Sequence, residues 1–148
     1  MQIGVIGASE CDGALEKIAE ETGRLIAKSG AVLVCGGRGG VMESACRGAN
    51  GEGGMTLGIL PDSSSGNLYL GAVVKSNLGI ARNALVVGSS DAVIAVGGSY
   101  GTLSEIAMAL KMEIPVFGLE TWDIPGVEMC KTPEEAVSKA VLAAENRM

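Results

Sequence analysis

The residues best suited to chemistry in this chain follow an apolar segment, 92–96, in the second half of the sequence. Two glycines come directly after this segment, a glycine–threonine pair follows closely, and a glutamate lies one helical turn further on. This order is typical of a strand that runs through a glycine loop into a helix. Unpaired N–H groups and a partial positive charge at a helix N-terminus favour phosphate. The segment therefore predicts a phosphate site formed by Gly97, Gly98, Ser99, Tyr100, Gly101, Thr102 and Glu105.

The side chains of this segment have different expected roles. The Thr102 hydroxyl is expected to cap the helix or to donate a hydrogen bond to a phosphate oxygen. Glu105 lies too far inside the helix to be a capping residue, so it is either a solvated helix residue or a site carboxylate. Helical side chains lean toward the N-terminus of their helix, which favours the site. Tyr100 is the candidate for stacking on a base, because the chain has few aromatic residues.

A second glycine loop lies upstream. The apolar segment 31–35 is followed by glycines on both sides of Arg38, and then by Val41 and Met42 at the start of an expected helix. Neither loop has the spacing G-x-G-x-x-G or the Gly-Lys-Ser/Thr sequence of a P-loop, which argues against an NAD enzyme or an ATPase. Two such loops on one sheet instead predict a phosphorylated ligand between them, with contacts from Gly36, Gly37, Arg38, Gly39 and Gly40.

Four further residues are candidate contacts. Gly7 and Ser9 follow the first expected strand, so they should reach the same edge of the sheet as the two glycine loops. Arg82 is either an ion-pair partner on the surface or a phosphate ligand, since its planar fork suits phosphate. Asn77, just upstream, adds a polar donor. Arg38 is in the same way either solvated or a ligand contact.

Composition excludes several classes of protein. The net charge of −6 argues against binding of nucleic acid through a basic face. No apolar run reaches the roughly 18 residues of a membrane span, and no basic leader precedes the first strand, so we expect a cytoplasmic protein. Four cysteines without C-x-x-C spacing and the absence of histidine predict no metal site. Any acid–base chemistry falls to carboxylates, a lysine, a tyrosine or water.

The order of the expected elements predicts an α/β fold. Apolar strands are expected at 2–7, 31–35, 56–60, 72–75, 92–96 and 114–119, and helices at 12–29, 40–50, 80–88, 102–112 and 132–145. Strands that alternate with helices and read as continuous apolar runs indicate a parallel sheet covered on both faces. We therefore expect a doubly wound, Rossmann-like sheet in which residues 1–148 form a single nucleotide- or phosphate-binding domain.

Both glycine motifs resemble those of the LONELY GUY proteins, a family formerly labelled lysine decarboxylases. The segment Gly97–Glu105 is similar to their P-G-G-x-G-T-x-x-E motif, and Gly36–Met42 is similar to their G-G-x-x-G-L-M loop. The resemblance extends from Ile3 to Phe117. It implies a nucleoside 5′-monophosphate phosphoribohydrolase, with Arg82 and Glu105 as catalytic residues and a nucleoside monophosphate as ligand. Lysine decarboxylase activity is not expected.

Several residues depart from the hydrolase pattern. Gly97 stands where the hydrolases have proline, Asn83 where they have lysine, and Ile80-Ala81 where they have His-Glu. In these respects the chain is more similar to a sister branch, the molybdenum-cofactor carrier proteins. This resemblance implies a binding protein for a molybdopterin-type ligand that is not covalently held. Carrier is our first hypothesis, and hydrolysis of the N-glycosidic bond is the alternative.

The helices expected at 80–88 and 102–112 predict self-association. Both carry more apolar residues than a single sheet-facing stripe needs. A second copy of the chain would cover the excess, which predicts a homodimer or a higher homo-oligomer. The family resemblance implies the same.

Overall fold

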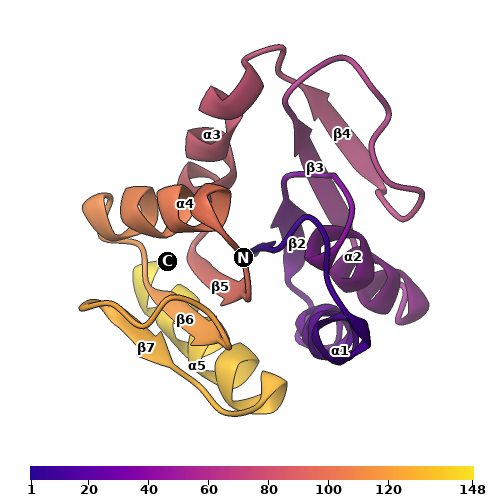
Figure 1. The fold of residues 1–148 in the computed structure, drawn as a ribbon. Coiled ribbons are helices and arrows are strands. Elements are labelled where there is room, and N and C mark those ends of the chain that lie inside the picture. Colours follow the sequence, from indigo (N-terminus) through magenta and orange to yellow (C-terminus); the bar gives the residue numbers. More distant parts are fainter.

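Seven parallel strands form one sheet with helices on both faces in the computed structural model, which describes residues 1–148 (Figure 1). The strands are β1 (Gln2–Gly7), β2 (Val32–Cys35), β3 (Thr56–Leu60), β4 (Ala72–Lys75), β5 (Ala92–Val96), β6 (Val116–Leu119) and β7 (Val127–Met129). The helices are α1 (Gly13–Lys28), α2 (Val41–Gly51), α3 (Arg82–Gly88), α4 (Tyr100–Lys111) and α5 (Pro133–Arg147), with a 3₁₀ turn η1 (Gly79–Ala81) before α3. The expected doubly wound α/β fold is confirmed.

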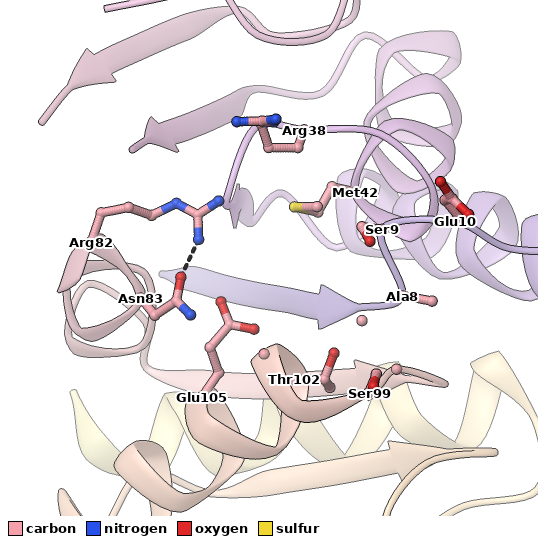
Figure 2. Close-up of a pocket in the computed structure, with 13 residues that line it drawn as sticks. Ala8, Ser9, Glu10, Arg38, Met42, Arg82, Asn83, Ser99, Thr102 and Glu105 are labelled. Atoms are coloured by element: carbon pink, nitrogen blue, oxygen red, sulfur yellow. Dashed lines mark hydrogen bonds between the residues drawn. The ribbon is translucent and has the colours of Figure 1, made fainter. Parts of the chain in front are cut away.

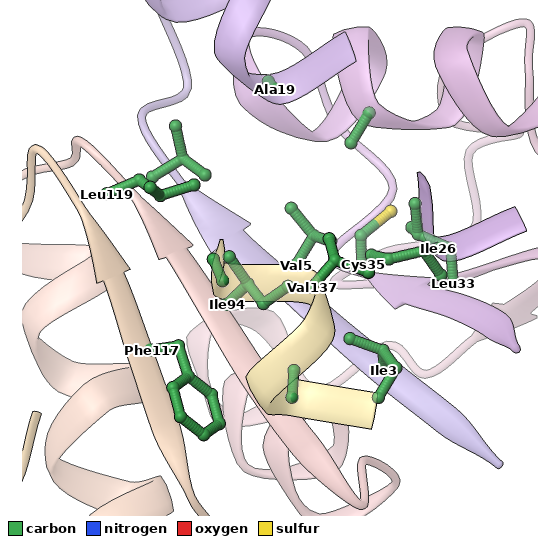
Figure 3. Packing of buried hydrophobic residues seen from close by; sticks show 14 of the residues in the cluster. Ile3, Val5, Ala19, Ile26, Leu33, Cys35, Ile94, Phe117, Leu119 and Val137 are labelled. Carbon is green, nitrogen blue, oxygen red and sulfur yellow. The ribbon is translucent and has the colours of Figure 1, made fainter. Parts of the chain in front are cut away.

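Both faces of the central strands are buried, which explains why these strands read as continuous apolar runs. In β1, Ile3 and Val5 belong to the core beneath α1, α2 and α5, whereas Ile6 belongs to the core beneath α3 and α4. Figure 3 shows the first of these cores, where side chains of β1, β2, β5 and β6 meet α1 and α5. None of the helices is long and apolar enough to cross a membrane.

The strand order places the ends of β1, β2 and β5 next to one another. The sheet runs β4-β3-β2-β1-β5-β6-β7, so the chain builds outward from β1 on one side and then restarts at β5 on the other. Open α/β sheets bind ligands in the crevice at such a switch point. At this point Gly7 pairs with Val96, and a Cβ on Gly7 would lie 2.2 Å from the Val96 carbonyl oxygen. A glycine is therefore required where the two strands meet.

Helices α1 and α2 touch each other through their backbones. A Cβ on Gly23 of α1 would lie 1.8 Å from the Ala45 carbonyl oxygen, and one on Gly48 of α2 would lie 1.9 Å from the Glu20 carbonyl oxygen. Side chains at these two positions would force the helices apart, because glycine is what permits such a close approach.

The structure adds one strand to the sequence-based expectation and shifts several element boundaries, two of them at the site. A seventh strand, β7, extends the sheet beyond β6; it is only three residues long and too short for an apolar pattern to reveal. Helix α4 begins at Tyr100, before the expected Thr102, because the glycine loop ends in the first helical turn. The helix expected at 80–88 is divided into η1 and α3, which places Arg82 at the start of α3.

Candidate functional site

A cavity of about 620 Å³ opens at the switch point of the sheet. The loops after β1, β2 and β5 form one part of its wall, and the N-terminal parts of α2, α3 and α4 form the rest (Figure 2). Its lining residues are Gly7, Ala8, Ser9, Glu10, Arg38, Met42, Arg82, Asn83, Gly98, Ser99, Gly101, Thr102 and Glu105. The cavity is thus polar, and it contains two arginines and two glutamates.

Most of the residues expected from the sequence line this cavity. They are Gly7, Ser9, Arg38, Arg82, Gly98, Ser99, Gly101, Thr102 and Glu105. The other glycines of the upstream loop shape its surroundings: Gly37 and Gly39 line an adjoining hollow of about 500 Å³ that shares Arg38, and Gly40 precedes α2. Gly36 accepts a hydrogen bond from Arg82 at its carbonyl oxygen.

Besides these glycines, three further expected contacts lie outside the cavity. Asn77 is exposed in the turn after β4, with a positive φ of 54°. Tyr100 is 78% exposed, and its ring packs against Trp122, with ring centroids 6.2 Å apart. Gly97 is buried behind the loop, where its carbonyl oxygen accepts a hydrogen bond of 2.6 Å from the Thr121 hydroxyl. The cavity therefore has no aromatic platform.

Helices α2 and α4 begin at the cavity without a side-chain cap, although the first N–H of α2, that of Val41, donates to the Ala8 carbonyl oxygen at 2.9 Å. No side chain caps α2 or α4, whereas Asp12 caps α1 and Thr132 caps α5 with hydrogen bonds of 2.9 and 3.2 Å. Uncapped N–H groups and the helix dipole favour an anion at these two positions. Thr102 does not cap α4, contrary to one expected role: it is buried within the first turn, and Ser99 occupies the capping position.

Backbone conformation at both loops requires glycine. Gly40 has a φ of 62°, and a Cβ there would lie 2.3 Å from the Ala8 carbonyl oxygen. Gly98 has a φ of 104°, and a Cβ there would lie 2.1 Å from the Thr102 hydroxyl oxygen. Both values lie in the left-handed region that other residues rarely adopt. The glycines thus hold the loops in the shape that exposes the helix N-termini.

Arg82 is half-buried and only partly satisfied by the protein. It donates hydrogen bonds from Nη1 to the Asn83 side-chain oxygen and from Nη2 to the Gly36 carbonyl oxygen, the latter at 3.3 Å (Figure 2). Its Nε is buried without a partner. Burial lowers the pKa of the guanidinium, and the nearby Glu105 opposes this effect. Arg82 is therefore a cation with an unused donor beside the cavity.

Glu105 points into the cavity from α4, on the same side as Arg82 and Asn83 (Figure 2). It is only 7% exposed. Burial raises the pKa of the carboxyl group from its ordinary value near 4.5 to about 7, and the positive charge of Arg82 reduces the shift. Buried carboxyl groups with a raised pKa are common in functional sites, because they can exchange a proton near neutral pH.

Sequence reasoning missed four lining residues: Ala8, Glu10, Met42 and Asn83. Ala8 and Glu10 flank Ser9, so the same strand-end argument could have included them. Met42 belongs to the upstream glycine motif, but the sequence predicted contacts only from the glycines and the arginine of that motif. Asn83 was noted as a departure from the hydrolase pattern; its buried amide accepts from Arg82 and donates to the Ser104 hydroxyl at 3.5 Å, which links α3 to α4.

The sequence matches the model of a known protein family. A model described as the SLOG cluster4 family matches residues 1–146. The chain belongs to this family. An uncharacterized protein of Archaeoglobus fulgidus is 48% identical to this SLOG cluster4 protein over 143 residues, which is 95% of each chain.

Two solved structures are similar to this family member along nearly its whole length. The molybdenum cofactor binding protein from the phototrophic bacterium Rippkaea orientalis is 38% identical, with a TM-score of 0.89, and the match covers 95% of this chain and 96% of the other. The molybdenum cofactor carrier protein of Chlamydomonas reinhardtii is 32% identical, with a TM-score of 0.90 and coverage of 97% and 98%. The resemblance inferred from the glycine motifs is thereby confirmed.

Proposed function

We propose that the protein is a carrier that binds a phosphorylated, molybdopterin-type ligand without covalent attachment, with residues 1–148 acting as one ligand-binding domain in the cytoplasm. The observation that carries this proposal is the convergence of two uncapped helix N-termini with Arg38 and Arg82 on one cavity. Such a set of donors fits the phosphate of the ligand. The likeness to the two cofactor-binding proteins supports the choice of ligand.

The volume and the backbone lining of the cavity also suit a small ligand. The loop after β5 and the first turn of α4 reach the cavity wall without side chains at Gly98 and Gly101, and a volume of about 620 Å³ is ordinary for a small-molecule site. The phosphate would lie at the start of α4, and the remaining ring system would extend toward Met42 and Glu105. Unpaired donors on one side and an acidic group on the other would orient it.

Loading tests the proposal directly. The purified protein is mixed with molybdenum cofactor freshly released from a molybdoenzyme and separated from unbound ligand, and the pterin is then measured by its fluorescence after oxidation. We expect the pterin to elute with the protein. Elution of all pterin at the position of free ligand would contradict the proposal.

A hydrolase is the second candidate, and Glu105 is the observation that favours it. A carboxyl group whose pKa lies near 7, beside an arginine, could assist departure of a base from a nucleoside monophosphate. Incubation with AMP, followed by chromatography for free adenine, separates the two functions. Release of adenine by the parent that is lost in Glu105→Gln would favour the hydrolase. Binding without release favours the carrier.

Gly101→Val should weaken binding of phosphorylated ligands about tenfold, the equivalent of one hydrogen bond to a charged group. A Cβ on Gly101 meets no protein atom within 4 Å, so the valine should leave the fold intact and occupy ligand space. Titration calorimetry with AMP measures the loss. Gly13→Val is the matched control, because Gly13 also lies in a first helical turn with open space around it. Equal affinity of Gly101→Val and the parent would show that this turn does not hold phosphate.

Self-association is expected through the end of the molecule that carries β4, η1 and α3. Leu78, Ile80 and Leu85 are exposed there, and every residue of β4 is exposed as well. We expect the parent to sediment as a dimer or larger at micromolar concentration, and Ile80→Asp to shift it toward the monomer. Leu142→Asp, at an exposed leucine of α5, is the control. A monomeric parent would contradict the prediction.

A further inference from the structure

The Glu105 carboxylate has no hydrogen-bond donor within the protein. Its pKa reflects burial and the positive charge of Arg82, with no hydrogen bond to either oxygen. The neighbouring polar groups have their partners elsewhere: Arg82 donates to Asn83 and Gly36, and the Asn83 amide donates to Ser104. A carboxylate that is 7% exposed and aimed into a cavity therefore can take donors only from water or a ligand in that cavity.

The cavity wall near Glu105 suits a flat ring. A Cβ on Gly36 would lie 3.0 Å from the Met42 sulfur and 2.9 Å from Nη2 of Arg82, so the thioether and the guanidinium lie side by side against this glycine. The Met42 thioether makes favourable contacts with aromatic rings, while the guanidinium is left to bind the phosphate. Such a surface favours a planar heterocycle over a sugar in the space that Glu105 faces.

We propose that Glu105 accepts two parallel hydrogen bonds from the 2-amino-pyrimidinone edge of the ligand, the edge that pterins and guanine share. This edge presents a ring N–H and an exocyclic amino group in one plane, which match the two oxygens of a carboxylate. Adenine and hypoxanthine lack this pair of donors. The site thus selects the ring, while the helix N-termini and Arg82 hold the phosphate. The inference rests on the proposed function and names the part of the ligand that is recognised.

GMP and IMP provide the test, because they differ only in the 2-amino group. Titration calorimetry at pH 8 should give the parent a preference for GMP of roughly five- to 100-fold, the range for one good bidentate pair. Glu105→Gln should reduce this ratio to about threefold or less with little change in the affinity for IMP, since glutamine can accept at one position only. Glu145→Gln, the same change at an exposed residue of α5, should keep the parent's ratio.

The outcomes separate this inference from the proposed function. Equal affinity of the parent for GMP and IMP would overturn the role of Glu105 and leave the phosphate site intact. A preference for GMP that Glu105→Gln retains would also overturn it, because the recognition would then come from another group. Failure of the parent to bind either nucleotide at millimolar concentration would count against the phosphate site itself.

Discussion

Replacement of Arg82 by alanine is expected to weaken binding of phosphorylated ligands roughly ten- to 150-fold, the value of a hydrogen bond to a charged group. Arg82 is half-buried beside the cavity, and its Nε is buried without a partner. A phosphate in the cavity would compensate the burial of the guanidinium charge. Titration calorimetry with GMP and AMP measures the effect on the affinity.

Arg38→Ala provides the comparison for this variant. The Arg38 side chain is 53% exposed and lies 3.8 Å from Asp62, so its charge is screened by solvent and already paired. We expect a loss of no more than about threefold. An affinity of Arg82→Ala equal to that of Arg38→Ala would show that burial does not make Arg82 the stronger contact.

Glu105→Gln is expected to stabilise the ligand-free protein above pH 7 by about 1–3 kcal/mol. The folded protein holds a proton on Glu105 up to about pH 7, whereas the unfolded chain releases it near pH 4.5. The folded state thus binds more protons between these values, and the free energy of unfolding falls as the pH rises through this window. Glutamine stays neutral, so the variant does not lose this stability.

Urea denaturation of both proteins at pH 4.5 and pH 8 measures the difference. It should be small at pH 4.5, where the carboxyl is protonated in the folded state and about half protonated in the unfolded chain, and largest at pH 8. Glu145→Gln should behave like the parent at both values, because this residue is exposed. A Glu105→Gln variant that is less stable than the parent at pH 8 would mean that the carboxylate makes favourable contacts in the empty site.

Much of the fold could be predicted because burial on both faces leaves a strong mark on the strands. All five residues of β5 are buried, and the sequence there is apolar throughout. The apolar pattern is weak where a strand is little buried. Strand β7 is short and lies at the edge of the sheet, and none of its residues is fully buried. The start of α4 was misplaced because Gly101 disfavours a helix, although a first turn tolerates it.

The candidate site was predictable where backbone conformation dictates residue type. Gly40 and Gly98 are visible in the sequence because only glycine suits their φ values. The direction of a side chain cannot be inferred from residue type in this way. Tyr100 lies beside the glycine loop in sequence, yet its ring turns outward to Trp122, a partner 22 positions away that no local pattern reveals. The hydrogen bonds of Arg82 to Gly36 and Asn83, which leave its Nε without a partner, likewise depend on the three-dimensional fold.

The backbone contact between α1 and α2 determines which half of the site can move. Gly23 and Gly48 each pack against the backbone of the opposite helix, so α1 and α2 have no room to slide past each other. The loops after β1 and β2 lead into these two helices and are held by them. That part of the wall is therefore a fixed frame. Arg82 and Glu105 belong to α3 and α4 on the other face of the sheet, and α3 is a short helix preceded by an exposed turn. Ligand entry and release would thus follow fluctuations of α3 and α4 against a stationary half, on the timescale of local opening rather than of global unfolding.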